Sequence, residues 1–196
     1  MKSLDKLYEE MLKAAKAFGK TADDMVYGEG NPNAKILLIG EAPGAEETKL
    51  SRPFVGKAGK NLDEFLKVIC RQRPDIYITN VVKFRPYKVS DKGRLSNRPP
   101  KRDEIECMLP LLLEEIEAIA PDVVVTLGNV PLRAVLGTNK TTIGECHAKQ
   151  LKGKALKHSF ILFPLYHPAS IIYNRKLADV YNQDLLDLKQ LLDSGV

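Results

Sequence analysis

Four short, almost wholly apolar runs recur along the chain, and each is followed by a segment whose apolar residues have helical spacing. The runs lie at residues 35–39, 76–82, 123–127 and 160–165. Strands that are apolar throughout are typical of a parallel sheet whose two faces are both covered by helices. The alternation therefore predicts an α/β fold, a three-layer α/β/α sandwich around a central four-stranded parallel sheet.

Apolar residues at helical spacing also predict the covering helices. These lie near residues 4–18, 62–69, 103–120 and 177–192, with a shorter one directly after Gly128. Pro110 falls inside the 103–120 segment, so we expect a kink or a later start there. The chain of 196 residues has no internal repeat, low-complexity tract or linker, which predicts a single domain over residues 1–196.

The composition narrows the class of protein. Hydrophobic residues make up 44% and charged residues 28%, as in ordinary globular proteins. No apolar run approaches the roughly 20 residues that span a bilayer, and the first residues are charged rather than signal-like. We therefore expect a cytoplasmic protein with no membrane partner, and a monomer. Its three cysteines cannot all pair, which argues against a disulfide scaffold.

The positive charge is concentrated in one segment. The net charge of +5 is compatible with a polyanionic partner without establishing one. Residues 83–102 hold eight basic side chains against one acid, Asp91. Such a run is most often a solvated loop. Because it directly follows a buried strand, we predict that it forms a phosphate-contacting edge, with Lys83 and Arg98 among the contacts.

The carboxyl ends of the four predicted strands carry polar and turn-forming residues. In open parallel sheets, ligands bind at this edge. The ends read Gly40-Glu41-Ala42-Pro43-Gly44, Asn80-Val81-Val82-Lys83, Gly128-Asn129-Val130-Pro131 and His167-Pro168-Ala169-Ser170. Each alone is more often structural than functional, so the prediction depends on their convergence at one edge.

Together these side chains suit cleavage of an N-glycosidic bond. The amide of Asn80 both donates and accepts, and can pair with the edge of a flat base. Phe54 can stack on the face of that base. His167 can place an N–H on an oxygen where negative charge develops. Glu41 or Glu47 can orient a water and stabilise the cationic sugar of an oxocarbenium-like transition state.

Three motifs resemble those of the uracil-DNA glycosylase superfamily, and most closely its family four. Residues 40–47 with 52–59 resemble the first motif, residues 78–83 the uracil-reading strand, and residues 166–170 the final motif. Residues 97–100 and the helix around 104–107 are also similar to the segment that comes after that strand in the family. The resemblance runs in order over roughly residues 27 to 192.

The resemblance implies a role for each matching position. Phe54 would stack on the flipped uracil, Asn80 would bind its pairing edge, and His167 would stabilise the departing uracilate. Glu41 would help to place the water, and Glu47 would line the pocket. Ala42 and Gly44 would bring the backbone close to the base or the DNA strand. Residues 169–173 would form the loop that probes the duplex, with Ser170 as a contact and Ile171 or Ile172 as a wedge or, equally, as core.

One feature of family four is missing. Its members typically hold a four-iron cluster with four cysteines, two of them near the N-terminus. Here Cys107 matches one position, Phe84 stands at another, and no cysteine precedes Cys70. We therefore predict no iron–sulfur cluster, no other metal and no cofactor, with Phe84 and apolar neighbours packing in its place. Cys70 and Cys146 are expected to be packing residues.

The function expected from the sequence is hydrolysis of uracil from DNA, leaving an abasic site. Two alternatives remain open. One is a glycosylase for another deaminated base, such as hypoxanthine or xanthine. The other is a non-catalytic module that binds damaged DNA, although such a module has no need for Glu41, Asn80 and His167 together.

Overall fold

The computed structural model describes residues 2–195, apart from the side chains of Ile172, Tyr173 and Arg175. Its centre is a six-stranded sheet in the order β1-β3-β2-β6-β8-β7. The four inner strands run parallel, and the two edge strands pair antiparallel to them. The strands are β1 Glu29–Gly30, β2 Ile36–Gly40, β3 Tyr77–Asn80, β6 Val123–Leu127, β7 Leu151–Ala155 and β8 His158–Leu165.

The predicted four-stranded parallel sheet is confirmed as the inner part of this sheet. The two edge strands were not predicted. β1 has only two residues, too few for a pattern, and β7 alternates exposed lysines with buried small residues rather than forming an apolar run. Both are edge strands, which are exposed along one side and need no continuous apolar sequence.

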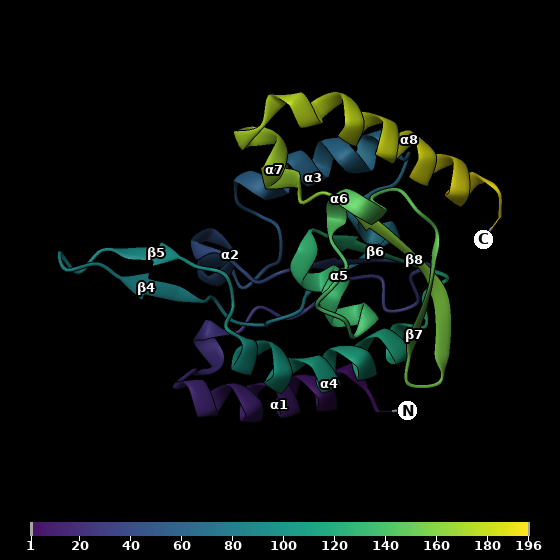
Figure 1. Cartoon of the computed structure of the whole chain (residues 1–196). Helices are drawn as coiled ribbons and strands as arrows, with labels where there is room; N and C mark the ends of the chain where they lie inside the picture. Colours follow the sequence, from purple (N-terminus) through teal and green to yellow (C-terminus); the bar gives the residue numbers. More distant parts are fainter. Residues whose placement is uncertain (1, 196) are drawn as a thin grey trace.

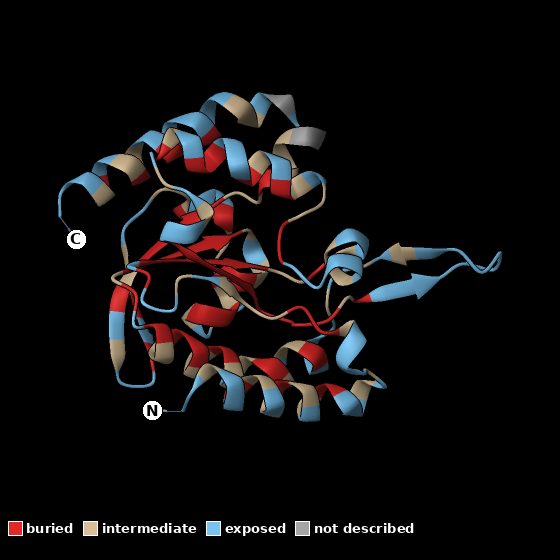
Figure 2. Ribbon diagram, turned by 180° about the vertical axis from the view of Figure 1, so that it is seen from behind, coloured by how far each residue is buried: buried red, intermediate tan, exposed pale blue. Residues whose placement is uncertain are grey.

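Helices cover both faces of the sheet, which gives the expected three layers (Figure 1). Successive residues of a strand point to opposite faces. In β2, Leu37 and Ile39 pack into the core beneath α1 (Leu4–Ala15), α4 (Arg102–Ile119) and α5 (Asn129–Leu136). Ile36 and Leu38 pack into the core beneath α3 (Lys57–Val68) and α8 (Ala178–Asp193). Figure 2 shows the buried residues along the sheet and the inner sides of these helices.

The helices are α1 Leu4–Ala15, α2 Ala45–Leu50, α3 Lys57–Val68, α4 Arg102–Ile119, α5 Asn129–Leu136, α6 Ile143–Cys146, α7 Pro168–Tyr173 and α8 Ala178–Asp193. The five predicted helices, α1, α3, α4, α5 and α8, are present near their predicted positions, whereas the short helices α2 and α6 were not predicted and α7 forms where the sequence predicts a loop. The prediction that α4 starts after Pro110 is wrong, because the helix begins at Arg102 and continues through Pro110. Its beginning is fixed by Glu104, whose carboxylate accepts a hydrogen bond of 2.6 Å from the Lys101 N–H. None of the helices within residues 2–195 is long and apolar enough to cross a membrane.

The basic segment after β3 is a hairpin rather than a loop. Strands β4 Tyr87–Val89 and β5 Leu95–Asn97 pair antiparallel in a separate two-stranded sheet. In both views the hairpin projects away from the central sheet and its helices (Figures 1 and 2).

Candidate active site

A pocket of about 370 Å³ lies at the carboxyl ends of the parallel strands. Asn80 is the last residue of β3, and His167 follows the end of β8 by two residues. The predicted site residues that line the pocket are Ala42, Gly44, Glu47, Phe54, Asn80 and His167. The convergence expected from the sequence is therefore present in the structure.

Phe54 is fixed in the pocket by an unusual backbone conformation. Its φ is +52°, in the left-handed region that bulky residues rarely adopt. Phe54 is 4% exposed, and its ring is inclined by 27° to the His167 ring, with centroids 6.1 Å apart. At Gly40, an added Cβ would stand 2.5 Å from the Phe54 ring and 2.4 Å from the Asn80 Oδ1. The absence of a side chain at Gly40 thus allows both residues to approach the end of β2.

His167 is held as a neutral hydrogen-bond donor. Its Nδ1 accepts a hydrogen bond of 3.1 Å from the Ala169 N–H, so the ring proton resides on Nε2. Burial lowers the pKa of His167 to about 4, although the nearby Glu47 carboxylate opposes this shift. At neutral pH the imidazole can therefore donate from Nε2 without carrying a charge.

Glu41 lies beside the pocket rather than in it. It borders an adjoining recess of about 320 Å³, which His167 also lines. The side chain is half-buried, and burial raises the pKa of its carboxyl above the ordinary value. The arrangement places a carboxyl group and the imidazole around one small space that is large enough for water.

Glu47 lines the pocket, but its oxygens are occupied by backbone groups. One oxygen accepts hydrogen bonds from the N–H groups of Val55 and Gly56, at 3.1 and 2.7 Å. The other accepts a bond of 3.1 Å from the Gly44 N–H. Glu47 therefore ties the loop after β2 to the loop that carries Phe54, and this bracing role was not predicted.

Comparison with known proteins agrees with this geometry. The family model of the uracil DNA glycosylase superfamily matches residues 27–189. The chain belongs to this superfamily.

Curated relatives support membership of the superfamily over nearly the whole length. A Type-4 uracil-DNA glycosylase of Sulfurisphaera tokodaii is 37% identical over 97% of this chain and 86% of the relative. One of Saccharolobus solfataricus is 35% identical over 99% and 88%, and one of Archaeoglobus fulgidus is 35% identical over 97% and 94%. The resemblance to family four is thereby confirmed.

Lys83 does not fit the predicted contact with DNA. Its side chain is 0% exposed, and its Nζ donates to Glu115, to Thr79 and, at 2.6 Å, to the Asn80 carbonyl. The ammonium lies behind the pocket, where burial lowers its pKa and the Glu115 carboxylate opposes that shift. A buried ammonium cannot reach a phosphate, so this prediction is corrected.

The other predicted DNA contacts lie nearer to the surface. Gly44 and Ser170 are partly exposed beside the pocket. Arg98 is also partly exposed, but it forms a two-pronged ion pair with Glu104, with both distances 2.7 Å. Ile171 packs partly against the core beneath α3 and α8. The side chain of Ile172, the other predicted wedge, lies outside the described residues.

The four-cysteine cluster implied by the resemblance does not fit the residues at its position. Phe84 is fully buried, and its ring lies 5.5 Å from that of Phe18. Cys107 contributes a single thiol there, 3.9 Å from the Ala14 carbonyl. Nowhere among residues 2–195 do three His, Cys, Asp or Glu side chains gather in a group that could hold a metal ion. The absence of iron stays a prediction, and no chemical step is assigned to a cluster.

The two remaining cysteines differ in their surroundings. Cys146 is buried, as expected of a packing residue, and its thiol lies 3.0 Å from the Thr142 carbonyl. Cys70 is exposed at the end of α3, so the expectation that it packs in the core is wrong. The residue follows the buried Ile69, two positions beyond the last residue of α3.

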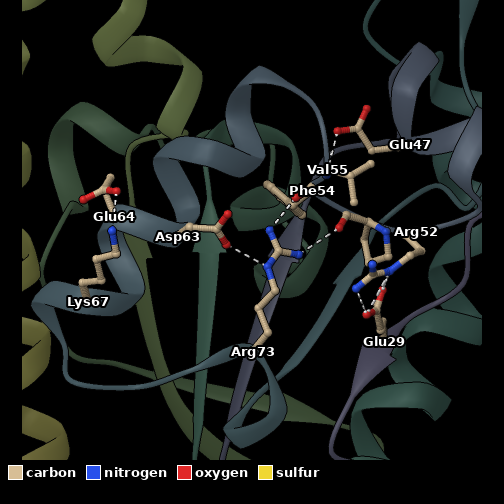
Figure 3. A network of polar contacts seen from close by, with 10 residues as sticks. Glu29, Glu47, Arg52, Phe54, Val55, Asp63, Glu64, Lys67 and Arg73 are labelled. Carbon is tan, nitrogen blue, oxygen red and sulfur yellow. Dashed lines mark hydrogen bonds and ion pairs between the residues drawn. The ribbon is translucent and has the colours of Figure 1, made fainter.

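Several residues that hold the site were missed by the sequence reasoning. Arg73 donates hydrogen bonds to the carbonyls of Pro53 and Phe54 (Figure 3). Asn61 on α3 donates a bond of 2.9 Å to the Pro168 carbonyl, beside His167. Asn97 borders both the pocket and the recess. Arg73 and Asn61 lie in charged segments that read as ordinary surface, so no local signal marked them.

Proposed function

We propose that this protein is a uracil-DNA glycosylase, which flips uracil out of DNA and hydrolyses its bond to deoxyribose. The observation that carries the proposal is the meeting of Phe54, Asn80 and His167 in one pocket of a chain that belongs to the superfamily. Relatives that cover nearly the whole chain carry the name Type-4 uracil-DNA glycosylase.

The residues suit the steps of this hydrolysis. The flipped base enters the pocket, Phe54 stacks against it, and the Asn80 amide pairs with its donor and acceptor edge. As the bond between the base nitrogen and the sugar carbon breaks, its electron pair moves onto the base. The neutral Nε2–H of His167 stabilises the negative charge on the uracil oxygen without having to transfer a proton.

The sugar left behind is cationic in character and takes up water. Glu41, beside the same imidazole, is the candidate to orient that water and to offset the positive charge. The water forms the new bond to the sugar carbon, its proton leaves to solvent or to the carboxylate, and an abasic site remains. Because water is the nucleophile, no lysine adduct is required.

Selectivity against thymine rests on the shape of the pocket. The thymine methyl group would have to fit beside Phe54 and Glu47, both held in place by the backbone bonds described above. One extra methyl in a rigid pocket costs about 1–3 kcal/mol when the wall cannot yield.

The deciding experiment is release of uracil from a labelled oligonucleotide, followed by cleavage of the abasic strand with alkali. Substrates with U opposite G, U opposite A and single-stranded U are each tested. Asn80→Ala and His167→Ala are each expected to lower the single-turnover rate by roughly 100-fold or more. Absence of scission with all three substrates would count against the proposal.

Two alternatives are separated by the same assay. A panel of substrates with hypoxanthine and xanthine tests preference for another deaminated base. Asn80 disfavours this alternative, because its amide suits the alternating donor and acceptor edge of a pyrimidine. A non-catalytic module would bind damaged DNA but release no base from any substrate. Cytoplasmic location, a monomeric state and a single domain over residues 1–196 remain predictions alongside this function.

A further inference from the structure

The β4–β5 hairpin exposes large apolar side chains. Tyr87, Val89 and Leu95 are 39%, 61% and 47% exposed. The hairpin projects away from the central sheet in both views (Figures 1 and 2), and the Lys20 ammonium lies 4.6 Å from the centre of the Tyr87 ring. Apolar side chains gathered at one exposed place are typical of a contact surface.

The pairing of the strands sorts these side chains onto one face. Tyr87 pairs with Asn97, Lys88 with Ser96 and Val89 with Leu95. Directly opposed residues of an antiparallel pair point to the same face, and the faces alternate along each strand. Val89 and Leu95 therefore share a face with Asn97, which borders the active-site pocket.

The remaining surface of the hairpin is basic. Lys88, Lys92 and Arg94 are all exposed, and no carboxylate within residues 2–195 forms an ion pair with any of them. Asp91 is the single acid between residues 87 and 97. Three cationic side chains without an ion-pair partner on a projecting hairpin attract a polyanion.

The base of the hairpin is anchored beside the pocket. Arg98 donates from Nε to the Tyr87 carbonyl at 3.2 Å while it is paired with Glu104. Arg85 donates from Nε to the Asn97 Oδ1 at 2.7 Å. These bonds fix the direction in which the β4–β5 hairpin extends from the rim of the pocket. The hairpin therefore has a fixed orientation relative to a ligand that enters the pocket.

We propose that the β4–β5 hairpin is an arm that grips DNA beside the flipped nucleotide. Lys88, Lys92 and Arg94 contact phosphates, while Val89 and Leu95 lie against sugars and base edges. The partner is DNA because the arm is cationic and because its apolar face continues into the pocket through Asn97. The inference rests on the proposed function, because that function places the flipped nucleotide of the DNA in the pocket.

The test measures binding to undamaged DNA, which does not depend on base release. Binding of a labelled duplex is followed by fluorescence anisotropy over a range of salt concentrations, and a single strand is measured in parallel. In K88A/K92A/R94A we expect affinity for the duplex to fall about 10- to 100-fold near 0.1 M salt, and the salt slope to fall by about 2 to 3.

A matched control exists on the other hairpin. Lys152, Lys154 and Lys157 are also exposed on β7 and the turn into β8, at the opposite end of the molecule in both views (Figures 1 and 2). K152A/K154A/K157A removes the same charge and is expected to change affinity less than about threefold, through the general field alone. Equal effects of the two triple variants, or unchanged binding in the first, would overturn the proposal.

The apolar face is tested separately with V89S/L95S. Affinity for duplex is expected to fall about fivefold with no change in salt slope, since no phosphate contact is lost. Unchanged DNA binding both in V89S/L95S and in K88A/K92A/R94A would refute the proposal that the hairpin contacts DNA. The exposed apolar face would then be a contact surface for a protein partner. If K88A/K92A/R94A binds DNA as the wild type does and uracil is released, only the proposed DNA contact of the hairpin is refuted. If the triple variant binds more weakly but the protein releases no uracil, only the proposed function is refuted.

Discussion

The guanidinium of Arg73 lies against the backbone of Phe54, and its Nη2 donates a hydrogen bond of 2.5 Å to the Phe54 carbonyl oxygen. On the other side of the same loop, Glu47 accepts the N–H of Val55 (Figure 3) and that of Gly56. Two charged side chains thus hold an aromatic residue at a φ of +52°, a conformation that costs of order 1–3 kcal/mol when nothing compensates it.

Replacing Arg73 should therefore loosen Phe54. In Arg73→Met we expect uracil release to slow roughly tenfold and stability to fall by about 1–3 kcal/mol, because two backbone carbonyls lose a charged donor. Single-turnover rates and urea unfolding measure the two effects. Arg71→Met is the matched control, since Arg71 donates only to the carbonyl of its neighbour Cys70. Equal rates in the two variants would show that Phe54 needs no such support.

The protonation of His167 is a second prediction. Since burial lowers its pKa to about 4, the ring should remain neutral, with its proton on Nε2, down to about pH 5. Nitrogen chemical shifts of the imidazole check this directly. Protonation near the ordinary value of 6.5 would contradict it.

The same shift makes stability depend on pH. The unfolded chain takes up the proton near 6.5, whereas the folded state takes it up near 4, so stability falls as pH drops between these values. From about pH 7.5 to pH 5 the wild type should lose about 2 kcal/mol more than His167→Gln does. Urea unfolding of both proteins at the two pH values measures the difference, and equal losses would argue against a depressed pKa.

The buried pair of Lys83 and Glu115 yields a prediction with two variants. Lys83→Met leaves the Glu115 carboxylate buried without its partner and should cost about 3–5 kcal/mol of stability. K83M/E115L should recover most of this loss. Uracil release by the double variant should still be roughly tenfold slower than by the wild type, because the Asn80 carbonyl has lost the Lys83 donor. Lys189→Met breaks an exposed pair and should cost less than about 1 kcal/mol.

The apolar replacement of the cluster is tested at Phe84. Protein purified without air should hold no stoichiometric iron or labile sulfide, and one cluster per chain would refute this. Phe84→Ala should lower stability by about 3–5 kcal/mol, because the fully buried ring packs against Phe18. Leu156→Ala, at a half-exposed position on the β7–β8 turn, should cost about 0.5 kcal/mol or less.

Local pattern was sufficient to predict the inner sheet and the pocket. The inner strands are apolar runs, and the carboxyl ends of parallel strands meet at one edge, so Asn80 and His167 could be placed together without coordinates. The sequence predicts a loop in place of the hairpin, because Tyr87–Val89 and Leu95–Asn97 are too short to show a period. Its exposed face differs little from a solvated loop in composition.

The sequence by itself determined the α/β order, the family and the residues around the uracil pocket, because each depends on spacing along the chain. Only the tertiary structure decided the environment of the charged groups. Lys83 and Arg98 belong to one basic run, yet one is buried against Glu115 and the other supports the hairpin. The partner of Lys83 lies 32 residues away, and burial by so distant a segment leaves no mark in the local pattern.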